Sequence, residues 1–150
     1  MRLLIQRVSK ASVTIEDRIA GEIGQGFCVF VGISDSDTKE IADKMIHKLV
    51  NLRIFSDENG KTNLNISSVD GELLIISQFT LYADCKHGNR PSFIKAGKPE
   101  PSELLYQYII EKCREFVPKV AHGEFGADMQ ISLVNDGPFT VWLDSEEIFY

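Results

Sequence analysis

Three polar side chains, Ser77, Gln78 and Thr80, follow directly after the apolar run Leu73–Ile76. A short run of aliphatic side chains predicts a buried strand. Where such a strand ends, backbone N–H groups lose their partners in the sheet and can donate hydrogen bonds to the oxyanion of a hydrolysis reaction. The same residues also fit an ordinary strand end whose hydroxyls bond nearby backbone groups, and composition alone favours that simpler interpretation.

A second segment of interest is Asn135–Thr140, which contains the step Gly137-Pro138. Proline fixes its own φ angle, so a Gly-Pro step makes a stiff corner whose carbonyl groups can point outward. About 5–6% of X-Pro bonds in folded proteins are cis. Considered alone, the segment is explained most simply as a turn between two strands.

The motifs of several common enzyme classes are absent. The sequence has no Walker loop, no G-x-S-x-G elbow, no H-E-x-x-H pair and no Rossmann fingerprint. Its three histidines lack the spacing of metal ligands, so we expect neither a metal nor a cofactor. Its three cysteines form no C-x-x-C pair, which argues against a disulfide framework and for a cytoplasmic location. Among them, only Cys85, close to His87, is a candidate nucleophile or metal ligand.

Charges are distributed unevenly along the chain. Lys and Arg number 16 and Asp and Glu 22, and the resulting formal net charge of -6 argues against a general nucleic-acid binder. The segment 85–99 nevertheless carries four basic residues and no acid, namely Lys86, Arg90, Lys95 and Lys98. This segment is either a solvated loop or a local basic surface on an acidic protein.

Apolar periodicity outlines the scaffold that must position these segments. Strands are predicted over residues 3–8, 11–15, 19–23, 27–33, 53–55, 72–77, 129–134 and 139–143. Apolar residues at helical spacing predict amphipathic helices over 38–51 and 102–116. Residues 83–101 are loop-like, and a loop of that length in a compact domain usually serves a function.

The order of these elements indicates the fold class. Strands adjacent in sequence outnumber strand–helix–strand units, so we expect an α+β protein. It would form a single domain over residues 1–150, with a mostly antiparallel, barrel-like sheet and two main helices. Gln6 and Arg7 interrupt the N-terminal apolar segment, which is therefore no signal peptide. No apolar stretch approaches the ~20 residues of a membrane span, so we expect no membrane partner.

The two polar segments together resemble the signature motifs of the D-aminoacyl-tRNA deacylase family, of the D-tyrosyl-tRNA deacylase type. The resemblance covers nearly the whole chain. It rests on Gln6–Val8 with Ala11–Val13, Asn51–Phe55, Ser77–Asp84, Gly88–Phe93, Gly123–Met129 and Asn135–Thr140. No single motif is decisive, but all of them in order and at the family's spacing are specific. Phe139 and Cys85 depart from residues that are frequent in the family at these positions.

The resemblance implies an activity and an assembly. Members hydrolyse the ester that joins a D-amino acid to the terminal adenosine of tRNA, accept glycine (including glycine mischarged on tRNA(Ala)) and reject L-aminoacyl esters. The family is homodimeric and needs no cofactor. By this resemblance, Gly137 and Pro138 form a cis pair that enters the partner subunit's pocket. There its carbonyls would hold the substrate's α-amino group and exclude an L side chain, which is selection by rejection.

The resemblance also implies roles for Ser77, Gln78, Phe79 and Thr80 as the catalytic set. The Phe79 N–H, helped by that of Thr80, would stabilise the oxyanion, and Gln78 would position the terminal adenosine or the ester. Thr80 is either a covalent nucleophile or a residue that shapes the pocket. Since no base is near it in sequence, we favour activation of water by the substrate's own 2′-hydroxyl. Lys86, Arg90, Lys95 and Lys98 would contact phosphates of the acceptor end.

Two alternatives stay open at this point. One is a different hydrolase that uses Thr80 or Cys85 as its covalent nucleophile. The other is a non-catalytic module that binds DNA or RNA.

Overall fold

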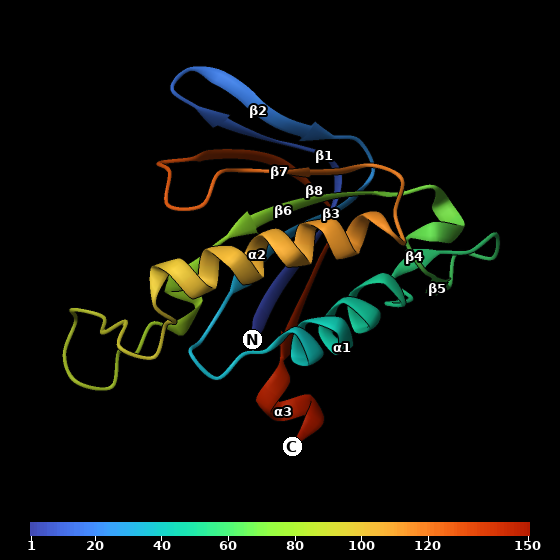
Figure 1. The fold of residues 1–150 in the computed structure, drawn as a ribbon. Helices are drawn as coiled ribbons and strands as arrows, with labels where there is room; N and C mark the ends of the chain where they lie inside the picture. The colour runs from blue at the N-terminus through green and yellow to red at the C-terminus, as the bar shows by residue number, and fades with distance from the viewer.

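The computed structural model describes residues 1–150 and is built around a six-stranded sheet (Figure 1). At its centre, β1 (Arg2–Ile15) pairs antiparallel with β2 (Arg18–Ile23), β3 (Gly26–Gly32) and β8 (Gln130–Asp144). Beyond β3, β6 (Glu72–Ser77) and then β7 (Val120–His122) add in parallel. The sheet is therefore mixed, whereas the order of strands in the sequence predicted a mostly antiparallel one.

Two helices cover one face of this sheet. These are α1 (Lys39–Val50) and α2 (Pro99–Arg114), and both were predicted from apolar spacing. The Thr38 hydroxyl accepts a hydrogen bond from the Ile41 N–H and so caps α1. Helix α2 begins three residues earlier than predicted because prolines are tolerated in a first helical turn. The short helix α3 (Ser145–Phe149) was not predicted, and no helix is long and apolar enough to cross a membrane.

Several smaller elements differ from the sequence-based expectation. A two-stranded sheet forms from β4 (Phe55–Ser56) and β5 (Thr62–Leu64). Short 3-10 turns occupy η1 (Ser67–Val69) and η2 (Phe79–Tyr82), so the chain turns directly after β6 rather than continuing extended. The two strands predicted over 129–134 and 139–143 are one strand, β8, interrupted by an irregularity.

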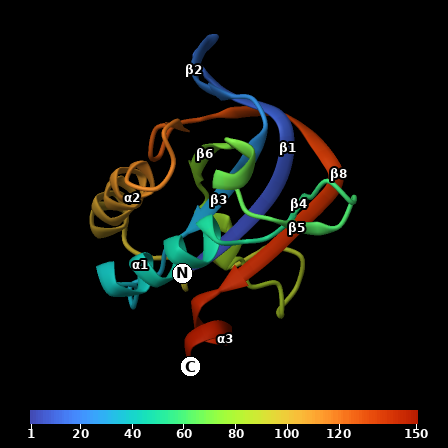
Figure 2. The same ribbon diagram turned by 90° about the vertical axis from the view of Figure 1, so that its right-hand side faces the viewer.

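The sheet curls until it is nearly a barrel, and this curling creates a second core (Figure 2). The helix-covered face holds the larger core, which includes Leu3 and Ile5 of β1. Near Ser9 the pairing of β1 with β8 shifts by one residue. Such a bulge bends a strand and switches the side chains that follow to the other face. As a result Ala11 and Val13 enter the second core, which the curled sheet encloses.

The Tyr106 hydroxyl ties α2 to the strand that leads into the polar segment. It is buried and donates a hydrogen bond to the Ile75 carbonyl at 2.7 Å. Burial raises the pKa of Tyr106, so the hydroxyl stays protonated and remains a donor.

We expect the substitution Tyr106→Phe to lower the free energy of unfolding by about 1 kcal/mol, the net worth of one buried hydrogen bond. The matched control is Tyr108→Phe on the same helix, which removes a hydrogen bond to Asp43 at the part-exposed surface. Denaturant unfolding measures both. Equal stability of Tyr106→Phe and the unsubstituted protein would contradict this role of the hydroxyl.

Candidate active site

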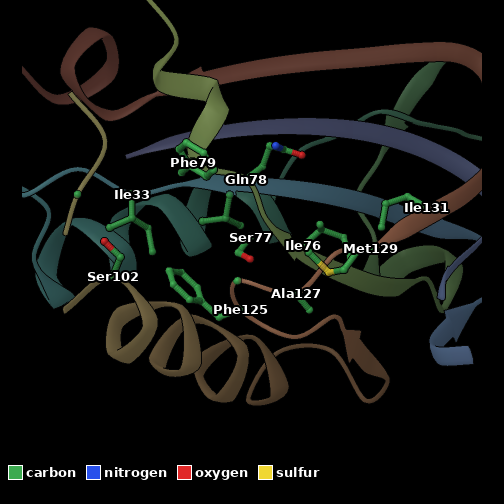
Figure 3. Close-up of a pocket in the computed structure, with 13 residues that line it drawn as sticks. Ile33, Ile76, Ser77, Gln78, Phe79, Ser102, Phe125, Ala127, Met129 and Ile131 are labelled. Carbon is green, nitrogen blue, oxygen red and sulfur yellow. The ribbon is translucent and has the colours of Figure 1, made fainter. Parts of the chain in front are cut away.

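A cavity of about 270 Å³ lies where β6 ends (Figure 3). Ser77 projects into it from the end of the strand, and Gln78 and Phe79 form its upper edge. Most of the remaining lining is apolar. The cavity is therefore a mostly hydrophobic space with a few polar groups along one edge, which is the usual character of a small-molecule site.

The chain turns sharply at this edge. The Gln78 N–H still donates to the Val31 carbonyl at 2.8 Å, as a sheet residue would, and η2 begins with the next residue. The first N–H groups of a helical turn have no partner inside that turn. The N–H groups of Phe79 and Thr80 therefore have no carbonyl partner within η2.

The side chains of this segment are also arranged by direct contacts. The Gln78 amide donates to the Thr80 hydroxyl at 2.5 Å. Phe79 is 56% exposed and meets the ring of Phe93 edge-on, with centroids 5.1 Å apart. Phe93 belongs to the long loop after η2, so this aromatic pair joins the loop to the edge of the cavity.

Thr80 lacks the surroundings of an activated nucleophile. It does not line the cavity, and its only side-chain partner is Gln78, which is not a base. Burial raises the pKa values of Cys28 and Cys113 to about 12, so neither forms a thiolate near neutral pH. Cys85 is exposed in the loop, away from the lining of the cavity.

Gly137 and Pro138 lie in the irregular stretch of β8. Thr140 pairs with Gln6 and Asn135 with Val8, so four residues of β8 lie opposite the single residue Arg7. The Gly137–Pro138 peptide bond is cis, and Gly137 has a φ of +127°, which favours glycine. A side chain at Gly137 would also meet the Arg7 guanidinium at 2.8 Å.

Arg7 of β1 holds the corner at Gly137 and Pro138 in place. It is 9% exposed, and its Nε donates to the Asp136 carbonyl at 2.9 Å. Its Nη1 donates to the Ile54 carbonyl at 2.5 Å, and its guanidinium lies 4.8 Å from the centre of the Phe139 ring. A buried guanidinium needs such partners because leaving it unpaired would be costly. Arg7 therefore holds the residues before and after the Gly-Pro step.

The two signature segments do not meet within one chain. Arg7, opposite the corner, pairs with Phe27, which pairs with Leu73, four residues before Ser77. The corner and Ser77 are thus separated by three strand-to-strand spacings across the sheet and by four residues along a strand. Together these separations amount to roughly 20 Å within the sheet. Neither Gly137 nor Pro138 lines the cavity.

The four predicted basic residues lie in or beside the loop after η2. All four side chains, Lys86, Arg90, Lys95 and Lys98, are exposed. The Nζ atom of Lys95 lies 3.6 Å from the Oδ2 atom of Asp84. The Asp84 carboxylate also accepts the Lys86 N–H. This hydrogen bond and the charges of Lys95 and Lys86 hold the pKa of Asp84 below its usual range. Asp84 thus stabilises the base of the loop.

Sequence patterns missed much of the cavity wall. Phe125, Ala127 and Met129 line it from one side, and Ser102 at the start of α2 lines it from another. The segment 123–129 is part of the family resemblance, which implies no role for it. The chain brings together no group of three His, Cys, Asp or Glu side chains that could hold a metal ion.

Comparisons with known proteins agree on one family. Residues 4–144 match the family described as D-Tyr-tRNA(Tyr) deacylase. The D-aminoacyl-tRNA deacylase of Clostridium novyi (strain NT) is 53% identical over 149 residues, which cover 99% of this chain and 100% of that protein. The D-aminoacyl-tRNA deacylase of Histophilus somni (strain 2336) is 55% identical over 144 residues, covering 96% and 99%.

Two solved structures share the fold of this chain. A structure described as a c-Myc DNA Unwinding Element Binding Protein has a TM-score of 0.91 and 39% identity, and covers 96% of this chain and 98% of its own. A probable eukaryotic D-amino acid tRNA deacylase has the same fold, with a TM-score of 0.81 at 18% identity, covering 95% and 97%. On the match of residues 4–144 and on these identities, the chain belongs to the D-Tyr-tRNA(Tyr) deacylase family.

Proposed function

We propose that this protein is a D-aminoacyl-tRNA deacylase, a hydrolase that releases free D-amino acid and tRNA. The observation that carries the proposal is the apolar cavity edged by Ser77, Gln78 and Phe79, in a chain whose curated relatives bear that name. The whole chain, residues 1–150, would act as one domain in the cytoplasm, without a cofactor. Glycyl-tRNA, including glycine mischarged on tRNA(Ala), would also be cleaved because glycine has no side chain to reject.

In the proposed reaction, water attacks the ester carbonyl and forms a tetrahedral oxyanion. The bond to the 3′-oxygen of the adenosine then breaks, and that oxygen takes up a proton. The N–H of Phe79, with that of Thr80, is proposed to stabilise the oxyanion. Ser77 and Gln78 would orient the ester and the terminal adenosine at the edge of the cavity.

Water, rather than Thr80, is the proposed nucleophile. The Thr80 hydroxyl is bonded to an amide and has no base as a partner, which supports a role in shaping the site. The 2′-hydroxyl beside the scissile ester would activate the water in place of a protein base.

Chiral selection is proposed to come from a second copy of this chain. The corner at Gly137 and Pro138 is too far along the sheet to reach the cavity of its own chain, but it could enter that of a partner. Its carbonyls would then hold the α-amino group of the substrate. A backbone held by Arg7 cannot yield to an L side chain, and a D side chain would point elsewhere.

A partly exposed apolar row on the sheet supports a homodimer. Ile76, Phe30, Leu4 and Trp142 are neighbours across β6, β3, β1 and β8, on the face opposite the helices. Ile76 is buried in the second core, Phe30 and Leu4 are half-buried, and Trp142 is 41% exposed. The row begins at Ile76, which lines the cavity, and ends at Trp142 on β8, the strand that carries Pro138. A partner on this face would therefore lie beside both signature segments.

The exposed basic side chains of the loop suit the acceptor end of tRNA. Lys86, Arg90 and Lys98 would contact its phosphates, and Lys95 would do so while paired with Asp84. The exposed ring of Phe79, supported by Phe93, offers a surface for stacking the terminal adenine.

The first prediction concerns the substrate. Purified protein should hydrolyse D-tyrosyl-tRNA and glycyl-tRNA and leave L-tyrosyl-tRNA intact, as measured by release of labelled amino acid. Replacing the terminal adenosine by 2′-deoxyadenosine should abolish cleavage of the D ester. Equal cleavage of the D and L esters would contradict the proposal. Cleavage of neither, together with tight binding of DNA, would favour the second candidate suggested by the DNA-binding relative.

The second prediction tests the oxyanion donor. Phe79→Pro removes the N–H at the first position of η2, where a proline is sterically acceptable. We expect kcat to fall about 100- to 1,000-fold, the usual loss for one such donor. The control Phe79→Ala keeps the N–H, and should mainly raise KM through loss of stacking. Equal kcat values for the two variants would rule out this donor.

The competing covalent mechanism is tested on the same assay. A Thr80→Ala, Cys85→Ala double variant should retain hydrolysis of D-tyrosyl-tRNA, because neither side chain is proposed to attack the ester. An acyl-enzyme trapped on either residue, or loss of all activity in a folded double variant, would instead support covalent catalysis.

A separate prediction concerns the dimer. We expect sedimentation of the 16.9 kDa chain as a dimer, and of Leu4→Glu as an inactive monomer, because a carboxylate in the apolar row would be buried without a partner. The control Leu104→Glu changes a leucine that is 64% exposed on α2 and should remain dimeric and active. An active monomer in either variant would contradict the shared site.

A further inference from the structure

The turn η2, which carries the proposed oxyanion donor, packs against Gly32 of β3. Arg2 of β1 lies between Gly32 and Asp144 in the pairing of the strands. At Gly32 an added Cβ would lie 3.0 Å from the Leu81 Cβ and 3.3 Å from the Gln78 carbonyl oxygen. Both distances are tighter than ordinary van der Waals contact, so the missing side chain lets η2 lie directly against the sheet.

Arg2 holds the same turn from the side. Its Nη1 donates to the Leu81 carbonyl at 2.9 Å, and its guanidinium lies 4.4 Å from the centre of the Tyr82 ring. Tyr82 is buried, and burial raises its pKa to about 12, so the ring is neutral where the cation rests on it. Arg2 thus contacts the last two residues of a turn whose first residue, Phe79, lines the cavity.

The other side of the guanidinium is fixed as well. Arg2 Nε donates to the Asp144 carboxylate at 2.8 Å, and this carboxylate is 5% exposed and also accepts the Glu146 N–H. The guanidinium further lies 5.6 Å from the Trp142 ring. With both ends of its planar group engaged, Arg2 has little freedom to shift, and neither has the carbonyl that it holds.

We propose that Arg2 is a positioning residue that, together with the space left by Gly32, fixes η2 and thereby the place of the Phe79 N–H. The inference rests on the proposed function, in which that N–H stabilises the oxyanion. A displaced donor would leave substrate binding largely intact but weaken an interaction formed in the transition state, so the loss appears in kcat rather than in KM.

The main variant is Arg2→Met, which keeps an unbranched side chain and removes every donor. We expect kcat for D-tyrosyl-tRNA to fall about 10- to 100-fold, the range for small misplacements of a catalytic group, with KM within about twofold. Arg2→Lys, with one ammonium in place of the planar fork, should recover part of the loss. Gly32→Ala should also lower kcat, because its methyl group pushes on the same turn while Arg2 is intact.

The matched control is Asp144→Asn. Arg2→Met loses the ion pair with Asp144 as well as the bond to Leu81, and therefore becomes less stable. Asp144→Asn loses the ion pair alone and leaves Arg2 free to donate to Leu81. We expect similar losses in melting temperature for these two variants, but a clearly smaller fall of kcat for Asp144→Asn, because its Arg2 still donates to the Leu81 carbonyl.

A structural readout separates a positioning role of Arg2 from a role in stability alone. Backbone amide NMR signals of residues 79–82 should move in Arg2→Met and Gly32→Ala and move clearly less in Asp144→Asn. Unmoved signals in Arg2→Met, or an equal fall of kcat in Asp144→Asn, would overturn the positioning role. A protein that cleaves no D-aminoacyl-tRNA at all, yet shows the expected movement of the signals, would overturn the proposed function and leave the seating of η2 standing.

Discussion

The proposed chiral selection depends on the contacts of the buried Arg7 guanidinium. It bonds the carbonyls of Asp136 and Ile54 and lies on the Phe139 ring, so it joins β1, β8 and the segment before β4. Because a buried cation is stable only when its partners stay in place, this set of contacts makes the corner at Gly137 and Pro138 rigid. A corner that could shift would have no means of rejecting an L side chain by collision.

Because the corner is rigid, we propose that each active site combines the cavity of one chain with the corner of the other. The corner cannot approach the cavity of its own chain, which lies roughly 20 Å away along the sheet. A filter made of backbone carbonyls is insensitive to the identity of the D side chain, which suits an enzyme that must accept many amino acids. A partner on the row from Ile76 to Trp142 would lie beside both the corner and the cavity.

Local patterns predicted the parts of the fold that depend on local physics. Apolar spacing located α1 and α2, and aliphatic runs located β3 and β6. The parallel pairing of β3 with β6 was missed because pairing partners far apart in sequence leave no local signal. The role of Arg7 was missed for a related reason, since its partners Asp136 and Ile54 lie 129 and 47 residues away in sequence. The polar segment at Ser77 was visible, whereas the wall at Phe125 and Met129 required the third dimension.

The most direct test of the shared site is a mixture of two defective variants. Phe79→Pro lacks the proposed oxyanion donor, and Pro138→Ala lacks the proposed filter. If each site combines the two segments from different chains, subunit exchange produces dimers with one intact and one doubly defective site. The intact site of a mixed dimer should then combine hydrolysis of D-tyrosyl-tRNA, which Phe79→Pro has lost, with rejection of the L ester, which Pro138→Ala has lost. Mixed dimers no more active or selective than their parents would show that the segments do not act across the interface.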